Sequence, residues 1–312
     1  MENLLVAIRV VAPLFLMLLV GVLLKRLGMI AEITEKQMNR MVFRCFLPLL
    51  LFYNIYTTSL ENSFDPLLLT FSIIAVLAMV ILSFVLVLAT EKENSRRGVM
   101  IQAMFRSNFV LFGLPVTVSL FGQQAAGIAS LVIAVVVPMF NILSVIVLEI
   151  FRGGNIQPMK ILRGIITNPL VIASAIGLLF LFTGLRLPYS CEKAVADLSA
   201  VATPLAFVVL GASFHFSDTR KYRRQLTIGL LGKLVLMPAL FLPIAALIGI
   251  HGPQMAVVMA MLASPTAVSS YTMAQQMDGD APLAGQLVVF GTLFSILTVF
   301  LWVFALKQAA II

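Results

Sequence analysis

The chain alternates between long apolar stretches and short polar, charged segments. An α-helix needs about 20 predominantly apolar residues to cross the hydrocarbon core of a bilayer. The runs of this length predict spans at residues 3–26, 35–57, 66–90, 98–121, 126–151, 158–184, 189–213, 222–249, 254–276 and 282–308. The second run is amphipathic in its first half, so we expect it to begin at the interface. The pattern predicts an all-α polytopic membrane protein of ten transmembrane helices.

The amino-acid composition is that of a membrane protein rather than a soluble one. Hydrophobic residues make up 61% of the chain and charged residues only 11%, whereas soluble domains carry about 25% charged residues. Ten spans with short loops use all 312 residues, so no separate extramembrane domain is expected. The two cysteines have no metal spacing, and the first span has an acidic start without a cleavage site, so we expect it to be retained. We expect no cofactor, no metal and no enzymatic activity.

The basic residues predict an orientation. Fifteen of the 21 lie around the first, third, fifth and seventh connections, and cytoplasmic loops carry such an excess. They are Lys25, Arg26, Lys36, Arg40, Arg44, Lys92, Arg96, Arg97, Arg152, Lys160, Arg163, Arg220, Lys221, Arg223 and Arg224. Only the ninth connection dissents, with Asp278 and Asp280. Both termini are predicted outside, and the net charge of +8 reflects orientation rather than nucleic-acid binding.

Prolines indicate an internal repeat. Pro13 and Pro48 are 35 residues apart, as are Pro169 and Pro204, which lie 156 positions further along the chain; Pro265 follows Pro115 by 150 positions, close to the same offset. An odd number of spans per half requires the second copy to be inverted. We therefore expect two inverted five-helix repeats, residues 1–153 and 154–312.

The fourth and ninth spans carry the strongest site signal. Pro115, two residues after Gly113, and Pro265 lie near the middle of their spans, and a proline removes one amide donor and kinks or breaks a helix. Matching breaks in two inverted halves indicate a binding site at mid-membrane. The alternative is that each proline only kinks its helix.

Helices that restart at these prolines would direct free amides and positive dipole ends at a bound anion. The candidate amides are those of Val116, Thr117, Thr266 and Ala267. Polar side chains gather at the same places, namely Ser107, Asn108, Ser264, Thr266, Ser269 and Ser270.

At these residues the chain resembles the auxin efflux carrier family in its short bacterial form. The resemblance covers the whole chain and includes Asn108–x4–Gly113–x–Pro115 in the fourth span and Ser264–Pro265 in the ninth. It implies a bacterial inner-membrane protein in which broken helices 4 and 9 cross, as in bile-acid symporters and sodium–proton antiporters. Helices 1, 2, 6 and 7 would form a dimerising scaffold, and helices 3–5 and 8–10 an elevator-like moving domain.

The resemblance also implies a substrate class. In plant relatives an asparagine beside each break contacts the substrate carboxylate; Asn108 matches the first, while Thr266 or Ser264 would replace the second. Bacterial relatives are associated with malate, malonate and similar dicarboxylates.

Two basic residues lie deep within predicted spans. Arg106 is about 12 Å along the fourth span and Lys233 about 17 Å along the eighth, at 1.5 Å per residue. A charge at this depth should face a cavity or a partner. Either residue would attract an anion; alternatively Glu149 would pair with one of them, or Arg106 would extend to the interface.

No acidic residue lies near either break in the sequence, which disfavours sodium–proton exchange. A coupling cation, H⁺ or Na⁺, could still be held by Asn108 and Gln102 together with helix carbonyls. His215 and His251 fall near span ends. Tyr53 and Asn54 face either the site or a neighbouring helix.

The leading hypothesis is a secondary active transporter of a small organic anion, a mono- or dicarboxylate such as malate, malonate or an auxin-like acid. The alternatives are a passive anion channel of the same architecture and a membrane sensor.

Overall fold

The computed structural model describes residues 2–58, 65–152 and 158–312, which contain helices and no strand. The first half comprises α1 Glu2–Arg26, α2 Glu32–Met41, η1 Val42–Phe46, α3 Leu47–Tyr56, α4 Pro66–Thr90, α5 Asn94–Phe105, η2 Phe109–Gly113, α6 Leu114–Phe121 and α7 Gln123–Ile150. The second comprises α8 Pro158–Ile166, α9 Pro169–Thr183, α10 Tyr189–Ser213, α11 Ser217–Lys221, α12 Arg223–Leu231, η3 Gly232–Leu236, α13 Met237–Leu247, α14 Gly252–Ala263, α15 Ser269–Gln276 and α16 Ala281–Gln308. The all-helical prediction is confirmed.

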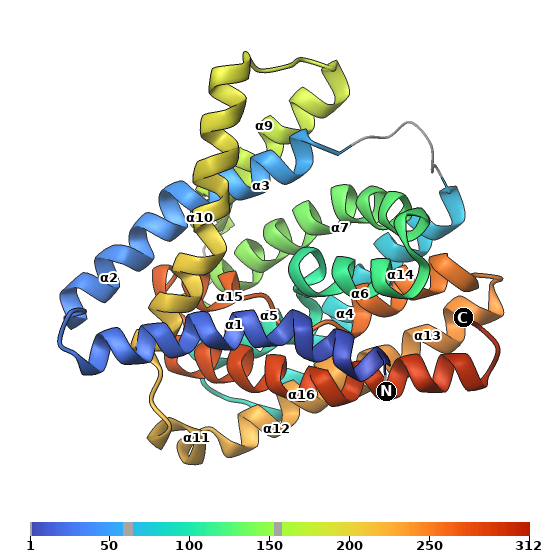
Figure 1. The fold of residues 1–312 in the computed structure, drawn as a ribbon. Helices are drawn as coiled ribbons and strands as arrows, with labels where there is room; N and C mark the ends of the chain where they lie inside the picture. The colour runs from blue at the N-terminus through green and yellow to red at the C-terminus, as the bar shows by residue number, and fades with distance from the viewer. Residues whose placement is uncertain (1, 59–64, 153–157) are drawn as a thin grey trace.

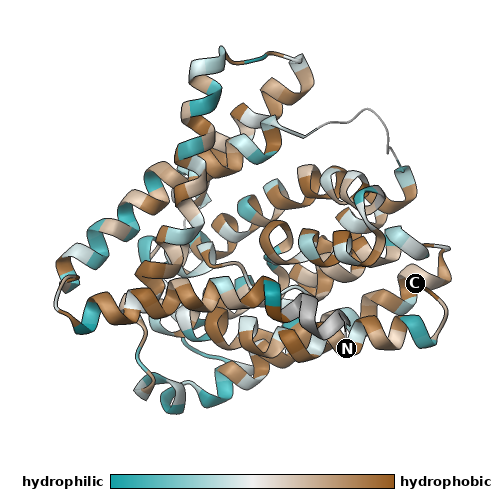
Figure 2. Ribbon diagram, viewed as in Figure 1, coloured by the Kyte–Doolittle hydropathy of each residue, from teal (hydrophilic) through white to brown (hydrophobic). Residues whose placement is uncertain are grey.

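Seven helical segments of the described chain are long and apolar enough to cross a membrane, and α9 and α14 are shorter apolar helices. Two predicted spans, 66–90 and 189–213, coincide with α4 and α10. Figure 2 shows hydrophobic residues along the central helices and hydrophilic ones on α2 and at helix ends. The chain is therefore a multi-pass membrane protein, and the count of ten spans stays a prediction.

The single span predicted at 158–184 is wrong, because α8 ends at Ile166 and α9 begins at Pro169. Asn168 Oδ1 accepts a hydrogen bond from the Leu170 amide at 2.9 Å. Asparagine at the N-cap followed by proline in the first turn is a strong helix start. This local signal interrupts a run that hydropathy alone reads as continuous.

Three prolines are accommodated inside helices by wider turns. The five-residue π-helical turns η1, η2 and η3 each end two residues before a proline, at Pro48, Pro115 and Pro238. A proline ring clashes with the carbonyl four residues earlier, and a π-turn relieves this by adding one residue to the turn. For Pro238 that carbonyl belongs to Leu234, and it accepts a hydrogen bond from Trp302 Nε1 at 2.9 Å.

Glycines allow close packing of α1 against α10, which cross in Figure 1. A Cβ at Gly21 would lie 2.0 Å from the Val208 carbonyl oxygen, and one at Gly211 would lie 2.0 Å from the Leu18 carbonyl oxygen. Small residues permit such backbone contact between membrane helices. Because α3 packs against both α9 and α10, the four helices α1, α3, α9 and α10 are linked by direct contacts.

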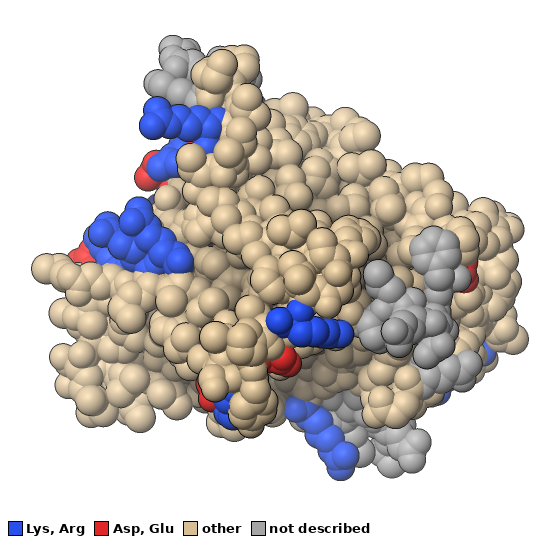
Figure 3. Space-filling model, turned by 90° about the horizontal axis from the view of Figure 1, so that it is seen from above, with Lys and Arg blue, Asp and Glu red and all other residues tan. Residues whose placement is uncertain are grey.

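The acidic ninth connection lies at the same end of the molecule as two basic connections. Arg152 Nε is 2.8 Å from Asp278 Oδ2, and Arg96 Nε is 3.2 Å from Asp280 Oδ2. These ion pairs explain why the ninth connection departs from the charge pattern. Figure 3 shows its largest basic patch at the left, the end at which α2 lies in Figure 1.

Candidate functional site

Two interrupted helices cross inside the molecule. The chain leaves helical geometry at Arg106–Asn108, between α5 and η2, and again at 264–268, between α14 and α15. The Asn108 amide donates a hydrogen bond to the Pro265 carbonyl at 2.7 Å, and Thr266 Oγ1 donates to the Ala103 carbonyl at 2.9 Å. Each interruption therefore satisfies polar groups of the other, as buried non-helical backbone in a membrane requires.

The structure has a break at Pro265, as predicted for the ninth span. The break predicted at Pro115 in the fourth span is wrong. The helix that contains Pro115 already begins at Phe109, and η2 accommodates the proline. Val116 and Thr117 are therefore inside a helix, and their amides are not at its start. The break occurs earlier because Asn108 bonds to Pro265 across the crossing, a tertiary contact that no local pattern reports.

Gly113 owes its position to this crossing. A Cβ there would lie 2.5 Å from Phe109 Cδ2 and 3.0 Å from Ser264 Oγ. A larger residue would therefore separate η2 from the second interruption.

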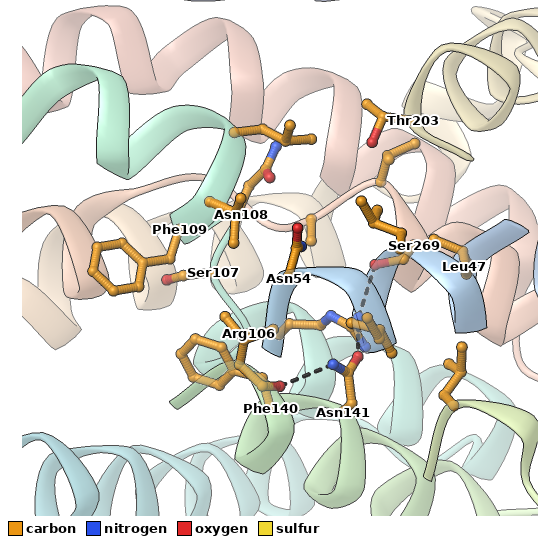
Figure 4. A pocket seen from close by; sticks show the side chains of 18 residues that line it. Leu47, Asn54, Arg106, Ser107, Asn108, Phe109, Phe140, Asn141, Thr203 and Ser269 are labelled. Atoms are coloured by element: carbon orange, nitrogen blue, oxygen red, sulfur yellow. Dashed lines mark hydrogen bonds between the residues drawn. The ribbon is translucent and has the colours of Figure 1, made fainter. Parts of the chain in front are cut away.

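A cavity lies beside the crossing and holds about 70 Å³ of space for the centres of water-sized molecules. This space is several times the roughly 10–15 Å³ that a cavity needs to hold one water, so several waters or a compact organic molecule fit in it. Figure 4 shows polar side chains from several helices converging on it. Its lining comprises Leu47, Leu50, Leu51, Asn54, Arg106, Ser107, Asn108, Phe109, Val110, Leu111, Val137, Phe140, Asn141, Leu170, Thr203, Ala267, Val268 and Ser269.

Arg106 supplies positive charge to this cavity. The residue is only 4% exposed, and its guanidinium donates to Asn141 Oδ1 at 2.6 Å and Ser269 Oγ at 2.7 Å and contacts Met273 Sδ at 2.7 Å. These partners are all neutral, and within the described residues no carboxylate lies within ion-pair distance of it. A buried cation with no counter-charge strongly favours the entry of an anion.

Asn108 adds an unused donor. Its Nδ2 is buried and has no hydrogen-bond partner among the described residues, and its side chain faces the cavity beside Arg106 (Figure 4). An unpaired buried donor costs about 1–3 kcal/mol, a cost that a bound acceptor removes.

Helix starts add further amides to the same lining. Phe109, Val110 and Leu111 form the first turn after the first break, and Ala267–Ser269 lead into α15. First-turn amides have no partner within their helix and form the positive end of its dipole. The cavity thus combines an arginine, an amide side chain and two helix starts, all of which suit a carboxylate.

Lys233 lies behind the crossing and does not line the cavity. It is 2% exposed in η3, and its Nζ donates to Ser107 Oγ, whose hydroxyl donates to the Met261 carbonyl. The expected alternative partner, Glu149, instead pairs with Arg152 at 3.1 Å. Lys233 therefore supports the first interruption through Ser107.

The hydroxyls near the second break divide into two groups. Ser264 Oγ donates to the Ala260 carbonyl at 2.5 Å, and Thr266 bonds to Ala103, so both hydroxyls serve the backbone. Neither side chain lines the cavity, whereas Ser269 does. Of the ten candidate residues, Arg106, Asn108 and Ser269 lie on the cavity; Gly113, Pro115, Val116, Ser264, Pro265, Thr266 and Lys233 do not.

Sequence reasoning overlooked two polar lining residues, Asn141 and Thr203. Asn141 follows an apolar run in α7, and an isolated asparagine within a membrane span is the signal that could have identified it. Asn54 lines the cavity, which decides the alternative left open for it, while the Tyr53 ring packs at a tilt against Tyr56, with ring centroids 6.5 Å apart.

Glu35 was also overlooked. It is buried in α2, and its Oε1 accepts bonds from Tyr271 Oη at 3.3 Å and Gln275 Nε2 at 3.4 Å, both in α15. Lys25 Nζ lies 3.7 Å from its Oε2. An acidic residue distant in the sequence therefore reaches the helix that follows the second break.

Comparisons with known proteins identify the family of the chain. A family model described as "Membrane transport protein" matches residues 6–303. An uncharacterised transporter of Methanothermobacter thermautotrophicus is 24% identical over 298 residues, covering 94% of this chain and 96% of that protein. An uncharacterised transporter of Methanocaldococcus jannaschii is 23% identical over 306 residues, with the same coverage. The chain belongs to the membrane transport protein family that includes the auxin efflux carriers, and it is a membrane transporter.

Proposed function

We propose that this protein is a secondary active transporter of a small organic anion, a mono- or dicarboxylate such as malate, malonate or an auxin-like acid. The observation that carries the proposal concerns two groups in one cavity: among the described residues, the Arg106 guanidinium has no acidic partner and the Asn108 side-chain amide has no acceptor. A carboxylate satisfies both at once, because it brings negative charge and acceptor oxygens. The small, largely apolar cavity favours a compact anion with a short carbon skeleton.

The transport cycle we propose is elevator-like. Ten spans would form two inverted repeats, residues 1–153 and 154–312, with α1, α3, α9 and α10 in a dimerising scaffold. The cavity is lined by α3, α9 and α10 of the proposed scaffold and, from the proposed moving domain, by α7 and the two interruptions. This position supports the proposal, because sliding of the crossed helices past the scaffold would carry the anion between the two sides of the bacterial inner membrane, with both termini periplasmic.

The coupling ion in this proposal is H⁺ or Na⁺. Gln102 Oε1 is buried without a partner among the described residues, near the end of α5, and is an acceptor suited to Na⁺. Glu35 is a carboxylate at the α2–α15 contact, where a proton would change the bonds from Tyr271 and Gln275. Transport measured against imposed Na⁺ or H⁺ gradients separates the two.

The proposal is tested by a thermal-shift screen of purified protein against small carboxylates, since a ligand that binds only the folded state raises the melting temperature. The wild type should be stabilised by at least one carboxylate, and Arg106→Gln should lose this response. Lys307→Gln, at the exposed end of α16, is the matched control and should keep it. Stabilisation that persists in Arg106→Gln would place the anion elsewhere.

Proteoliposomes distinguish carrier from channel. A carrier shows saturable uptake accelerated by the same anion on the opposite side of the membrane. Conductance without such counterflow would contradict secondary transport and favour the passive channel.

A further inference from the structure

An apolar groove runs along the outside of the molecule between α12, η3 and α16. It holds about 470 Å³ of space for water-sized molecules. Its apolar lining comprises Leu226, Leu230, Leu231, Leu234, Val235, Phe290, Phe294 and Leu297, with Thr219, Arg223, Thr227 and Thr298 completing it. From Arg223 to Val235 the helix rises about 18 Å at 1.5 Å per residue, close to the roughly 15 Å thickness of one leaflet of hydrocarbon.

A basic cluster lies at one end of this groove. Arg220, Lys221, Arg223 and Arg224 are exposed and, with Thr227 and Ile228, line a second hollow of about 490 Å³. This basic hollow shares Arg223 and Thr227 with the apolar groove, so the two are continuous.

The cluster has little internal neutralisation. Within the described residues none of its four cations forms an ion pair, although Lys221 Nζ lies 4.9 Å from the centre of the Tyr222 ring. The nearest acid in sequence, Asp218, lines a different cavity together with Lys25. Arginine donors arranged in this way suit the bidentate recognition of a phosphate.

We propose that the groove between α12 and α16 and the basic cluster at its end form a binding site for an anionic phospholipid. The phosphate contacts Arg220, Arg223 and Arg224, and one acyl chain lies along the apolar groove toward η3. The α11–α12 end of the groove lies at the left in Figure 1, the same end as α2 and its basic residues, which fits the anionic leaflet that attracts polybasic segments.

The two halves of the site together favour a lipid over other occupants. A free phosphate would use the basic hollow and leave the groove unfilled, while a second copy of this chain would bring a basic cluster against a basic cluster. A phospholipid alone matches charge at one end and a leaflet-length apolar channel at the other. This inference is independent of the transported substrate.

The test measures lipid binding to the intact purified protein by native mass spectrometry and by thermal shift. Phosphatidylglycerol should bind and stabilise the wild type, and phosphatidylcholine with the same acyl chains should do so far less. The triple variant Arg220→Gln/Arg223→Gln/Arg224→Gln should bind phosphatidylglycerol on the order of 100-fold more weakly, from about fivefold for each interfacial arginine. The control Lys36→Gln/Arg40→Gln/Arg44→Gln removes equal charge from α2 and η1 and should keep wild-type binding.

A second variant tests the groove without changing charge. Val235→Trp fills the channel at an exposed position (42% exposed) and should weaken phosphatidylglycerol binding while the basic cluster stays intact. Equal binding of both lipids, equal losses in the two triple variants, stabilisation by inorganic phosphate alone, or dimerisation through this face that excludes lipid would each overturn the proposal.

Discussion

The backbone amide of Asn108 donates a hydrogen bond to the carbonyl of Pro265, 2.7 Å away, although 157 positions separate the two residues in the chain. This contact joins the two interrupted helices at their crossing. In the membrane interior an unpaired backbone group costs several kcal/mol, so each break is stable only in the presence of the other. The Asn108 Nδ2 has no partner among the described residues, and the side chain faces the cavity that Arg106 also lines.

Arg106→Gln should separate binding from stability. Arg106 is a buried charge with neutral partners, and replacing such a charge by a neutral polar residue removes its desolvation cost. We expect the ligand-free variant to unfold at the wild-type temperature or above. The binding free energy of the carboxylate should become about 2–5 kcal/mol less favourable. Thermal unfolding with and without ligand measures both. A large loss of ligand-free stability would mean that Arg106 is structural.

Asn108→Ala should abolish transport while protein levels stay normal, because Nδ2 has no partner to lose in the part of the chain that the structure describes. The backbone bond to Pro265 remains, so the crossing is preserved. Counterflow in proteoliposomes measures the effect, with Asn168→Ala as a contrasting variant that loses the α9 cap and should lower stability instead. Full activity of Asn108→Ala would move the site away from the first break.

Trp302 and Pro238 should be energetically coupled through Leu234. Trp302→Phe leaves the Leu234 carbonyl without its indole donor and should cost about 1–3 kcal/mol of unfolding free energy. In a Pro238→Ala background the alanine supplies a backbone amide that can take over this carbonyl, so the loss should be smaller. A double-mutant cycle by denaturant unfolding measures the difference. Additive losses would contradict this account of the π-turn.

Glu91 should contribute a pH-dependent part of the stability. Its carboxylate accepts bonds from the amides of Lys92 and Glu93 at 2.8 and 3.0 Å and from Gln225 Nε2 at 2.6 Å. Burial raises the pKa of this carboxyl. The hydrogen bonds from Glu93, Gln225 and Lys92 together lower it by more, so the net pKa lies below its ordinary value.

A carboxyl whose pKa is lowered by folding adds stability above the pKa of the unfolded chain, about 4.3, and loses it as the pH falls through the folded value. The difference in melting temperature between the wild type and Glu91→Gln should therefore be largest above about pH 5 and should shrink as the pH falls below about 4.3. An unchanged difference at pH 3.5 would contradict this role.

Much of the fold could be predicted because charged and polar residues bound the apolar runs sharply. The segment 66–90 ends where Glu91 and Lys92 begin, and α4 ends at Thr90. The π-turns at Pro48, Pro115 and Pro238 could not be predicted, because one extra residue in a turn leaves hydropathy unchanged.

The site was predicted in kind but not in detail. Arg106 and Asn108 are recognisable as a charge and an amide within an apolar run. The position of the first break depends on the bond to Pro265, and the approach of Glu35 to α15 depends on the packing of α2, neither of which local sequence encodes. Pro115 therefore marked the correct span but the wrong residue, whereas Pro265 lies within its break.

The central claim is that a carboxylate binds in the cavity between the crossing and α3. Leu111→Cys, in a background of Cys45→Ser and Cys191→Ser, places one thiol on the cavity lining. Its alkylation rate should fall several-fold with a saturating carboxylate from the thermal-shift screen and should not respond when Arg106→Gln is added. An alkylation rate that the bound carboxylate leaves unchanged in the presence of Arg106 would contradict the account.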